Sequence, residues 1–245
     1  MSPDLFIQKG ALFIADAHES SERTLLWDFL LYVQENPPPQ LFLMGDMFDL
    51  LVGNVRYGVQ KYQRYIRRLE EIAQTCEVYY LEGNHDFNLS SLFVHVKVIA
   101  LQQQPITCKL PNGQKCLLLH GDKYGDLMHR CYTRTIRNPY VLFFLNAIDR
   151  GTHSSISKTI ESNQRKKRLC KPIRDFESVI ERKFLNYPQT EVIAEGHYHQ
   201  NRDFMVSKTR YINFPAFACN QSYFSVQSLP ETEFASKQFR SCPSK

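Results

Sequence analysis

The chain of 245 residues lacks the features of several specialised classes of protein. No stretch approaches the roughly 20 consecutive apolar residues that span a bilayer, and no basic region followed by an apolar run suggests a signal peptide. The seven cysteines are odd in number and show no C-x-x-C spacing, which favours free thiols in a reducing compartment over a disulfide framework. We therefore expect a cytoplasmic protein that can still contact a membrane surface.

The sequence also shows no internal repeat and no large excess of either charge. Its formal net charge is +5 and 43% of its residues are hydrophobic, as is ordinary for a soluble globular protein. The length allows one large domain with a substantial core, which we assign to residues 1–245. A protein that holds nucleic acid stably needs a longer basic stripe than this sequence offers, so no stable nucleic acid partner is expected.

Short apolar runs alternate with helical patterns along the first third of the chain. The runs at 11–15, 41–44 and 77–82 predict strands that are buried on both faces. Amphipathic spacing predicts helices at 20–35 and 57–75. A polar loop follows each strand, so the sequence predicts an α/β fold with its ligands at the carboxyl ends of the strands.

The second half of the chain interrupts this alternation with a helical region. We interpret residues 123–188 as a helical lid inserted within the single domain, and residues 228–245 as a flexible tail. Strands are predicted on both sides of the lid, at 93–101, 105–119 and 191–194. Within the lid we expect helices at 126–137, 139–150 and 172–186, with a polar connection at 151–170.

The lid carries an excess of positive charge. Residues 158–183 contain nine Lys or Arg and four Asp or Glu, a net of +5. Together with the aromatic and aliphatic residues of the preceding helices, this charge suits an anionic substrate that has an apolar part. A solvated helical face explains the same charge run equally well.

Five polar loops follow predicted strands, and five of the eight histidines lie in them. One histidine alone is more often a core or surface residue, but five at strand ends are hard to attribute to packing. Glycines at 45, 83, 121 and 196 would allow positive φ in these loops. The mixed carboxylate, imidazole and amide donors suit two divalent ions, with Mn²⁺ preferred. The loops offer no thiolate ligand, which argues against a structural zinc site. The expected ligands are Asp16, His18, Asp46, Asn84, His120, His197 and His199.

The charge of this set predicts the substrate. Two divalent ions bring +4 and the two aspartates return −2, so a residual charge of about +2 attracts phosphate oxygens. The sequence therefore predicts a hydrolase of phosphate esters or anhydrides. We expect His85 to act on the reacting phosphate, either by stabilising developing charge or by protonating the leaving oxygen, and Asp86 to orient His85.

These loops resemble the motifs of the calcineurin-like metallophosphoesterases. The family pattern of D-x-H, G-D-x-x-D/E, G-N-H-D/E, a histidine before G-D, and G-H-x-H occurs here in order between residues 16 and 199. The resemblance implies a four-layer α/β/β/α sandwich with a dimetal site. It also implies that Asp16, His18, Asp46 and His199 hold one ion, and that Asp46, Asn84, His120 and His197 hold the other.

Within the family, the chain is most similar to the bacterial UDP-2,3-diacylglucosamine diphosphatases of lipid A biosynthesis. The shared features are the total length, the start at Phe13-Ile14-Ala15-Asp16, the interval from His120 to His197, and inserted helices with an aromatic Asn-Pro-Tyr segment. The resemblance implies a lipid-linked nucleotide substrate and a peripheral position on the cytoplasmic face of the inner membrane. The candidate substrate contacts are Asn84, His85, Asp126, Tyr132, Asn163, Arg165, Lys166, Lys167 and His197.

One residue departs from that subfamily and keeps other functions open. The subfamily motif is G-N-R-D, but this chain has histidine, His85, in place of the arginine. The resulting G-N-H-D is the general form of the motif in the family. A soluble nucleotide, a phosphodiester or a phosphoprotein is therefore an alternative substrate. A non-enzymatic scaffold with the same fold is a third hypothesis, but such a protein would be expected to lack part of the ligand set.

Overall fold

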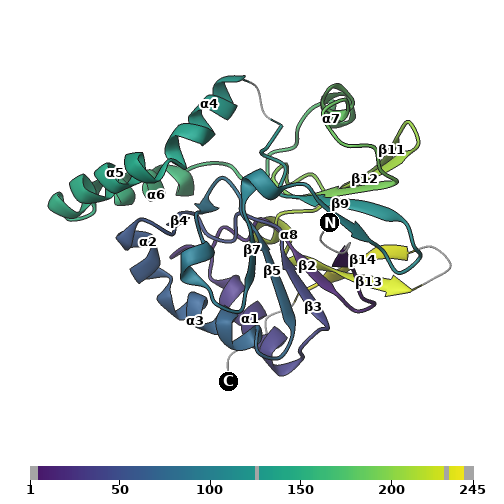
Figure 1. Cartoon of the computed structure of the whole chain (residues 1–245), viewed down its shortest axis with the longest axis horizontal. Coiled ribbons are helices and arrows are strands. Elements are labelled where there is room, and N and C mark those ends of the chain that lie inside the picture. Colours follow the sequence, from purple (N-terminus) through teal and green to yellow (C-terminus); the bar gives the residue numbers. More distant parts are fainter. Residues whose placement is uncertain (1–4, 125–126, 229–231, 240–245) are drawn as a thin grey trace.

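The computed structural model describes residues 5–124, 127–228 and 232–239, and two six-stranded sheets lie at its centre (Figure 1). In the first sheet, β2, β3, β5 and β7 run parallel, so their carboxyl ends lie at the same edge. Two antiparallel strands extend it beyond β2. The strand order is β14 (Thr232–Gln238), β13 (Ser222–Ser228), β2 (Leu12–Ile14), β3 (Gln40–Leu43), β5 (Glu77–Leu81) and β7 (Lys97–Ile99).

The second sheet has a parallel centre as well, formed by β9, β10 and β12. Strand β11 is antiparallel to β12, and β8 is antiparallel to β9. The order is β1 (Leu5–Phe6), β8 (Ile106–Lys109), β9 (Lys115–Leu119), β10 (Val192–Glu195), β12 (Thr209–Asn213) and β11 (Arg202–Val206). A short parallel ladder joins β4 (Leu51–Val52) to β6 (Asp86–Phe87) beside the first sheet.

The two sheets pack face to face through an aromatic core. The ring of Phe42 stacks on Phe13 at 4.4 Å and on Tyr79 at 4.8 Å between centroids. These rings come from three neighbouring strands of the first sheet and belong to the buried cluster that also contains residues of the second sheet. Burial on both faces explains why the strands read as continuous apolar runs.

Helices cover the outer face of each sheet. On the first sheet, α1 (Leu25–Glu35) and α3 (Gln63–Ile72) bury apolar faces at helical spacing, with α2 (Arg56–Lys61) beside them. On the second sheet, α7 (Phe176–Phe184) packs through Phe176 and Ile180. The four-layer α/β/β/α sandwich expected from the sequence is confirmed.

Three helices project from the sandwich and are called the helical insertion below: α4 (Leu127–Ile136), α5 (Pro139–Gly151) and α6 (Ser155–Arg165) (Figure 1). The expected lid at 123–188 was therefore too wide, because α7 belongs to an outer layer of the sandwich. The polar connection expected at 151–170 was also wrong, since most of it is α6. The hydroxyl of Tyr57 in α2 donates to Glu161 Oε2 of α6 at 2.6 Å, and Lys61 pairs with the same carboxylate, so the insertion is tied to the sandwich.

Two further expectations differ from the structure near the C-terminal end. The predicted flexible tail contains β14, whose residues pair with β13 across seven positions from Ser222 to Ser228. The cysteines are not all free thiols, because Cys170 and Cys219 form a disulfide across 49 residues of sequence. Cys219 lies on the short helix α8 (Phe217–Asn220), and Cys242 lies outside the described residues. Within the described ranges, no helix is both long and apolar enough to cross a membrane.

Candidate metal centre

The carboxyl ends of five strands deliver polar side chains to one place between the sheets. Strands β2, β3 and β5 of the first sheet and β9 and β10 of the second end just before them. Two groups of side chains each have ligand atoms within 4.8 Å of one another: Asp16, His18 and His199, and Asp46, His120 and His197.

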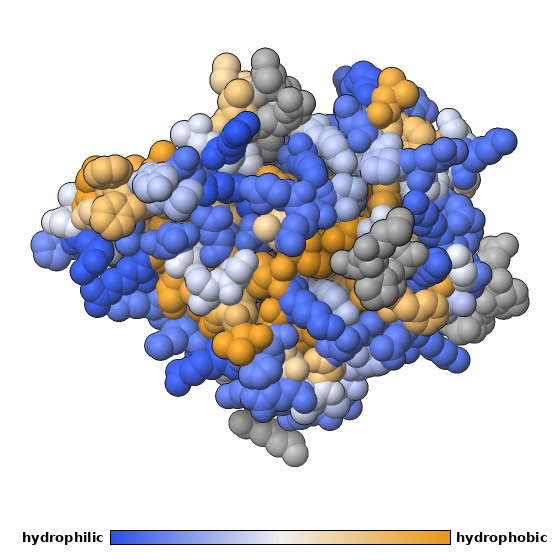
Figure 2. Space-filling view, in the orientation of Figure 1, coloured by the Kyte–Doolittle hydropathy of each residue, from blue (hydrophilic) through white to orange (hydrophobic). Residues whose placement is uncertain are grey.

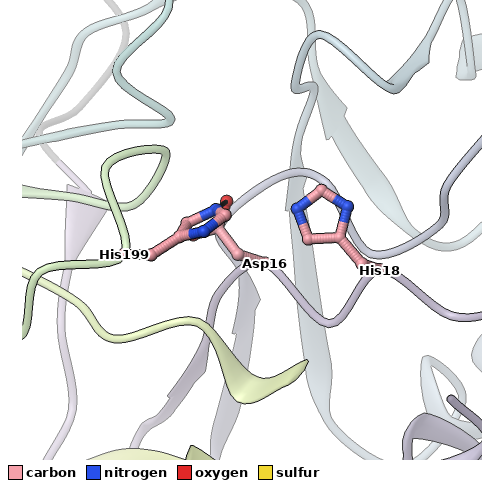
Figure 3. Close-up of side chains that lie close together, drawn as sticks. All are labelled: Asp16, His18 and His199. Carbon is pink, nitrogen blue, oxygen red and sulfur yellow. Dashed lines mark ion pairs between the residues drawn. The ribbon is translucent and has the colours of Figure 1, made fainter. Parts of the chain in front are cut away.

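In the first group, Asp16 is the central residue. His199 Nε2 lies 3.1 Å from Asp16 Oδ1, and both Asp16 oxygens accept from the backbone N–H of His197 at 3.0 and 3.2 Å. The carboxylate is fully buried. Figure 3 shows the side chains of Asp16 and His18, which come from one loop, beside that of His199, which comes from another. One strand end of each sheet therefore contributes to this group.

In the second group, His120 faces two oxygen donors. Its Nε2 lies 3.4 Å from Asp46 Oδ2 and 3.3 Å from Asn84 Oδ1. Its Nδ1 lies 2.9 Å from the carbonyl oxygen of Met44. The amide of Asn84 thus joins the second group as the sequence predicted, although its ligand role stays a prediction.

The orientation of the imidazoles fits divalent ions. Within the described part of the chain, His18 Nε2 is buried and has no hydrogen-bond partner, which a metal ion would supply. Backbone carbonyls of Met44 and Leu169 face Nδ1 of His120 and His199, so Nε2 of each ring is directed to the centre. Such outer contacts fix the tautomer of metal-binding histidines.

The electrostatics of the centre favour a charged carboxylate at Asp46. Burial raises the pKa of Asp46, but the charges of His120 and His85 outweigh burial and hold that pKa well below its usual value. Burial and the charge of His120 together lower the pKa of His197 to about 3. His197 is therefore neutral, as metal binding requires. At His199 burial is outweighed by the charge of Asp16, which raises the pKa of His199 to about 9, so a metal ion would displace that proton.

The backbone is strained where it carries the candidate ligands. Asp16, His18, Asp46, His197 and His199 all have positive φ, between 44° and 64°. Residues other than glycine rarely adopt this conformation, and such strain clusters at functional sites. Five candidate ligand residues in this state indicate that the surrounding contacts impose the loop geometry.

The glycines have two different functions, where the sequence suggested one. Gly45 and Gly121 have positive φ as expected, whereas Gly83 and Gly196 do not. At Gly83 the requirement is space, because a Cβ would lie 2.2 Å from Asp46 Oδ1. The loop after β5, which carries Gly83, therefore approaches the loop after β3, which carries Asp46, too closely for any side chain at this position.

Asp86 does not orient His85, contrary to the expectation from the sequence. The carboxylate of Asp86 is fully buried and accepts from the backbone N–H groups of Asp46, Met47 and Gly83 and from the hydroxyl of Tyr80. The physical reason is that Asp86 begins strand β6 and points inward, whereas the His85 ring points toward the centre. Burial and the charge of Asp46 raise the pKa of Asp86 to about 7, although its three N–H partners favour the ionised form.

The ring of His85 is oriented by a backbone group instead. His85 Nδ1 lies 3.0 Å from the carbonyl oxygen of Asp49, and Nε2 lies 4.0 Å from Asp46 Oδ2. The Asp49 carboxylate in turn accepts from Arg23 at 2.6 Å and lies 3.4 Å from His18 Nδ1. Sequence reasoning missed Arg23, because an arginine at the start of a helix is also a common surface residue.

An apolar cavity of about 140 Å³ opens beside His85 and Asn84. It continues between the helical insertion and the β4–β6 ladder. Most of its walls are aliphatic or aromatic, and a few polar side chains of α5 and α6 complete it. The apolar lining consists of Leu50, Val52, Val55, Phe87, Ile136, Leu142, Leu145, Ile156 and Ile160.

The remaining predicted substrate contacts are not gathered in this cavity. Asn163, Lys166 and Lys167 are exposed at the end of α6 or just after it. Arg165 Nη1 donates to Ser21 Oγ at 3.1 Å, in the loop that follows His18. Asp126 lies outside the described residues, and the side chain of Tyr132 is not described either.

Comparison with known proteins agrees with this geometry. The calcineurin-like phosphoesterase family model matches residues 11–201. A UDP-2,3-diacylglucosamine hydrolase of Coxiella burnetii (strain Dugway 5J108-111) is 24% identical over 199 residues, covering 78% of this chain and 81% of that protein. The enzyme of the same name from Histophilus somni (strain 2336) is 25% identical over 207 residues, and the alignment covers 78% of this chain and 85% of that protein.

Solved structures also align with most of the chain. A solution structure of a Thermotoga maritima protein covers 95% of this chain and 100% of its own, with a TM-score of 0.48 and 17% identity. The alignment with the phosphoesterase YfcE from E. coli covers 89% of this chain and 87% of YfcE, with a TM-score of 0.46 and 15% identity.

Proposed function

The chain belongs to the calcineurin-like phosphoesterase family, and from this we propose that it hydrolyses UDP-2,3-diacylglucosamine to UMP and 2,3-diacylglucosamine 1-phosphate in lipid A biosynthesis. The observation that carries the proposal is the apolar cavity that starts at His85 and Asn84 and continues into the helical insertion. A hydrolase of soluble phosphate esters would not need an apolar cavity next to its metal ligands. The named relatives from Coxiella and Histophilus support the same substrate.

The two groups of ligands would hold two divalent ions, with Mn²⁺ as the proposed species. Asp16, His18 and His199 would bind one ion, and Asn84, His120 and His197 the other, with Asp46 shared between them. When bound, the ions supply positive charge to the phosphate oxygens and make a water more acidic. Carboxylate, amide and imidazole donors without thiolate suit Mn²⁺.

His85 would act on the reacting phosphate. The carbonyl oxygen of Asp49 accepts the Nδ1 proton at 3.0 Å, so a protonated His85 presents its Nε2 proton to the centre. That proton can stabilise charge on a phosphate oxygen or pass to the leaving oxygen. The amide of Asn84 would also contact the substrate, because it lines the cavity beside His85.

The two ends of the substrate would meet different surfaces. An acyl chain suits the apolar lining of the cavity. The diphosphate suits Arg165, Lys166 and Lys167, since Arg165 already reaches the loop that follows His18. Asn163, Asp126 and Tyr132 stay predicted contacts of the same substrate.

We also propose that the protein works at the cytoplasmic face of the inner membrane. The aromatic residues Tyr140, Phe143 and Phe144 of α5 are 77%, 67% and 66% exposed, and Ile148 is 54% exposed. Figure 2 shows hydrophobic residues at the surface of the α5 end of the molecule. An apolar helix face next to basic residues suits the surface of an anionic bilayer.

An assay of UMP release tests the substrate. Purified protein with Mn²⁺ is incubated in detergent with UDP-2,3-diacylglucosamine or with the small diester bis(p-nitrophenyl) phosphate. Ile160→Trp narrows the cavity and should raise the KM for the lipid at least tenfold, while hydrolysis of the small diester is unchanged. The matched control is Thr159→Trp, because Thr159 is exposed on the same helix and should leave both activities unchanged.

Failure to release UMP, together with rapid hydrolysis of the diester, would refute the lipid substrate. That result would favour a soluble phosphodiester or nucleotide. The observation that favours this second function is His85, which stands where the diphosphatase motif has arginine.

A further inference from the structure

A buried cation outside the ligand set connects the helical insertion to the metal centre. Arg137 follows the last residue of α4 and is 7% exposed. The next residue, Asn138, caps α5 by accepting from the backbone N–H groups of Tyr140 and Val141. Arg137 therefore lies at the corner between the first two helices of the insertion.

The guanidinium of Arg137 reaches two of the loops that carry ligands. Nη2 donates to the carbonyl oxygen of Gly83 at 2.6 Å, and Nη1 donates to Glu82 Oε2 at 2.8 Å. Nη2 also lies 3.7 Å from Asp122 Oδ2. Gly83 is adjacent to Asn84, and Asp122 is two residues from His120, so one side chain contacts the chain beside both residues.

Arg137 also contacts the far end of the loop that carries Asn84 and His85. Its carbonyl oxygen accepts from Asn88 Nδ2 at 3.2 Å. The guanidinium carbon lies 4.7 Å from the centre of the Phe87 ring. Arg137 thus contacts residues 83–88 before and after Asn84 and His85, and it makes these contacts from the insertion rather than from the sandwich.

The charge and the planar geometry of the guanidinium together make these contacts specific to arginine. Glu82 and Asp122 are 1% and 2% exposed, and two carboxylates buried against one guanidinium are costly without that cation. A guanidinium can give parallel hydrogen bonds to a carboxylate and a carbonyl, whereas an ammonium offers no planar fork. Lysine at this position would keep the charge but lose one of the two directed contacts.

We propose that Arg137 is a positioning residue, which holds Asn84 and His85 in place against Asp46 and His120 while α4 and α5 are seated on the sandwich. The second ligand group then depends on the insertion, although the insertion contributes none of its ligands. Ile136 lines the cavity immediately before Arg137, so a molecule in the cavity packs against the same corner. The inference needs the family's phosphoester hydrolysis but not the lipid substrate.

Mn²⁺ binding and diester hydrolysis test the role of Arg137 together. In Arg137→Met, calorimetry should show that one of two Mn²⁺ ions binds 10- to 100-fold more weakly, as is common when an outer contact of a ligand is lost. Electron paramagnetic resonance should show loss of the exchange-coupled pair and retention of one isolated ion. The kcat for bis(p-nitrophenyl) phosphate should fall by a similar factor, and Arg137→Lys should be intermediate.

Two further variants keep the test decisive. Arg134→Met removes an exposed arginine of the same helix and should bind both ions as the unmodified protein does. If Arg137→Met fails to fold because Glu82 is left unpaired, the double variant Glu82→Gln/Arg137→Met removes both charges. A folded double variant that still binds one ion weakly supports positioning.

Either of two results overturns the inference. One is a folded Arg137→Met or double variant with both Mn²⁺ affinities and kcat unchanged, which would limit Arg137 to charge neutralisation. The other is equal weakening of both ions, which would indicate a general loosening of the sandwich. Lack of activity on the lipid substrate in the unmodified protein would refute the proposed substrate but not this role, because the small diester reports on it.

Discussion

Asp86→Ala distinguishes an organiser of the metal centre from a partner of His85. The Asp86 carboxylate accepts from the N–H groups of Asp46 and Gly83 at 2.9 Å each, from Met47 N at 2.5 Å and from Tyr80 Oη at 2.6 Å. Alanine leaves the buried N–H groups of Asp46 and Met47 and the hydroxyl of Tyr80 without an acceptor, each costing about 1.5 kcal/mol, whereas Gly83 N–H still donates to the backbone carbonyl oxygen at position 86. We therefore expect the free energy of unfolding to fall by about 4.5 kcal/mol.

The same substitution should weaken metal binding. Asp86 holds the backbone N–H of Asp46, whose carboxylate would be shared between both ions, and it also holds Gly83 next to Asn84. Without these contacts, the positive φ of Asp46 loses one of its supports. Both Mn²⁺ affinities should therefore decrease, and hydrolysis of a small diester should decrease with them.

Urea unfolding followed by fluorescence measures the stability change. Trp27 is the only tryptophan of the chain and packs in α1 at 5.2 Å from the ring of Tyr65, so its emission reports on the sandwich. Tyr80→Phe removes only one of the four partners of Asp86 and should cost about 1 kcal/mol. His85→Ala removes one hydrogen bond, to the carbonyl oxygen of Asp49, and should also cost only about 1 kcal/mol. An Asp86→Ala protein with the stability and Mn²⁺ content of His85→Ala would refute the organising role and favour orientation of His85.

Three other outcomes are expected. His85→Gln should lower kcat by about 10²- to 10⁴-fold, as for loss of a general acid, with Mn²⁺ stoichiometry by paramagnetic resonance unchanged. Reduction of the Cys170–Cys219 disulfide, which closes 49 residues, should lower the free energy of unfolding by about 4 kcal/mol in urea titrations, and Cys219→Ser should reproduce that value. The double variant Phe143→Ser/Phe144→Ser should sediment less with anionic vesicles, while hydrolysis of a small diester stays constant; equal sedimentation would contradict the membrane-facing role of α5.

The sandwich was predictable because its signals are local. A strand buried on both faces needs an unbroken apolar run, and the runs before Asp16, Asp46 and Asn84 supply it. The residue types in the loops were equally readable, since imidazole, carboxylate and amide groups at successive strand ends have few explanations besides metal binding.

Features that depend on distant partners were not predictable. Helix α7 has the same amphipathic pattern as the helices of the insertion, and only its contact with the second sheet separates it from them. Strand β14 is polar on its outer face, so it resembles a tail until β13 pairs with it. Cys170 and Cys219 are 49 residues apart, and their spacing alone gives no sign of a bond.

The roles of Asp86 and Arg137 show why ligands are easier to predict than their geometry. Adjacency suggested that Asp86 holds His85, but neighbouring residues at the start of a strand point in opposite directions. Arg137 contacts Glu82, 55 residues earlier, from a helix whose pattern indicates nothing about the metal centre. Asp86 and Arg137 both act through hydrogen bonds to backbone groups of the ligand loops. Because every residue type has these backbone groups, the sequence gives no sign of which residue a side chain will contact. The sequence therefore displays the side chains that carry the ligand chemistry. The left-handed backbone at Asp16, Asp46 and His199 is instead maintained by contacts between loops that are distant in the sequence, and these contacts exist only after the two sheets have packed together.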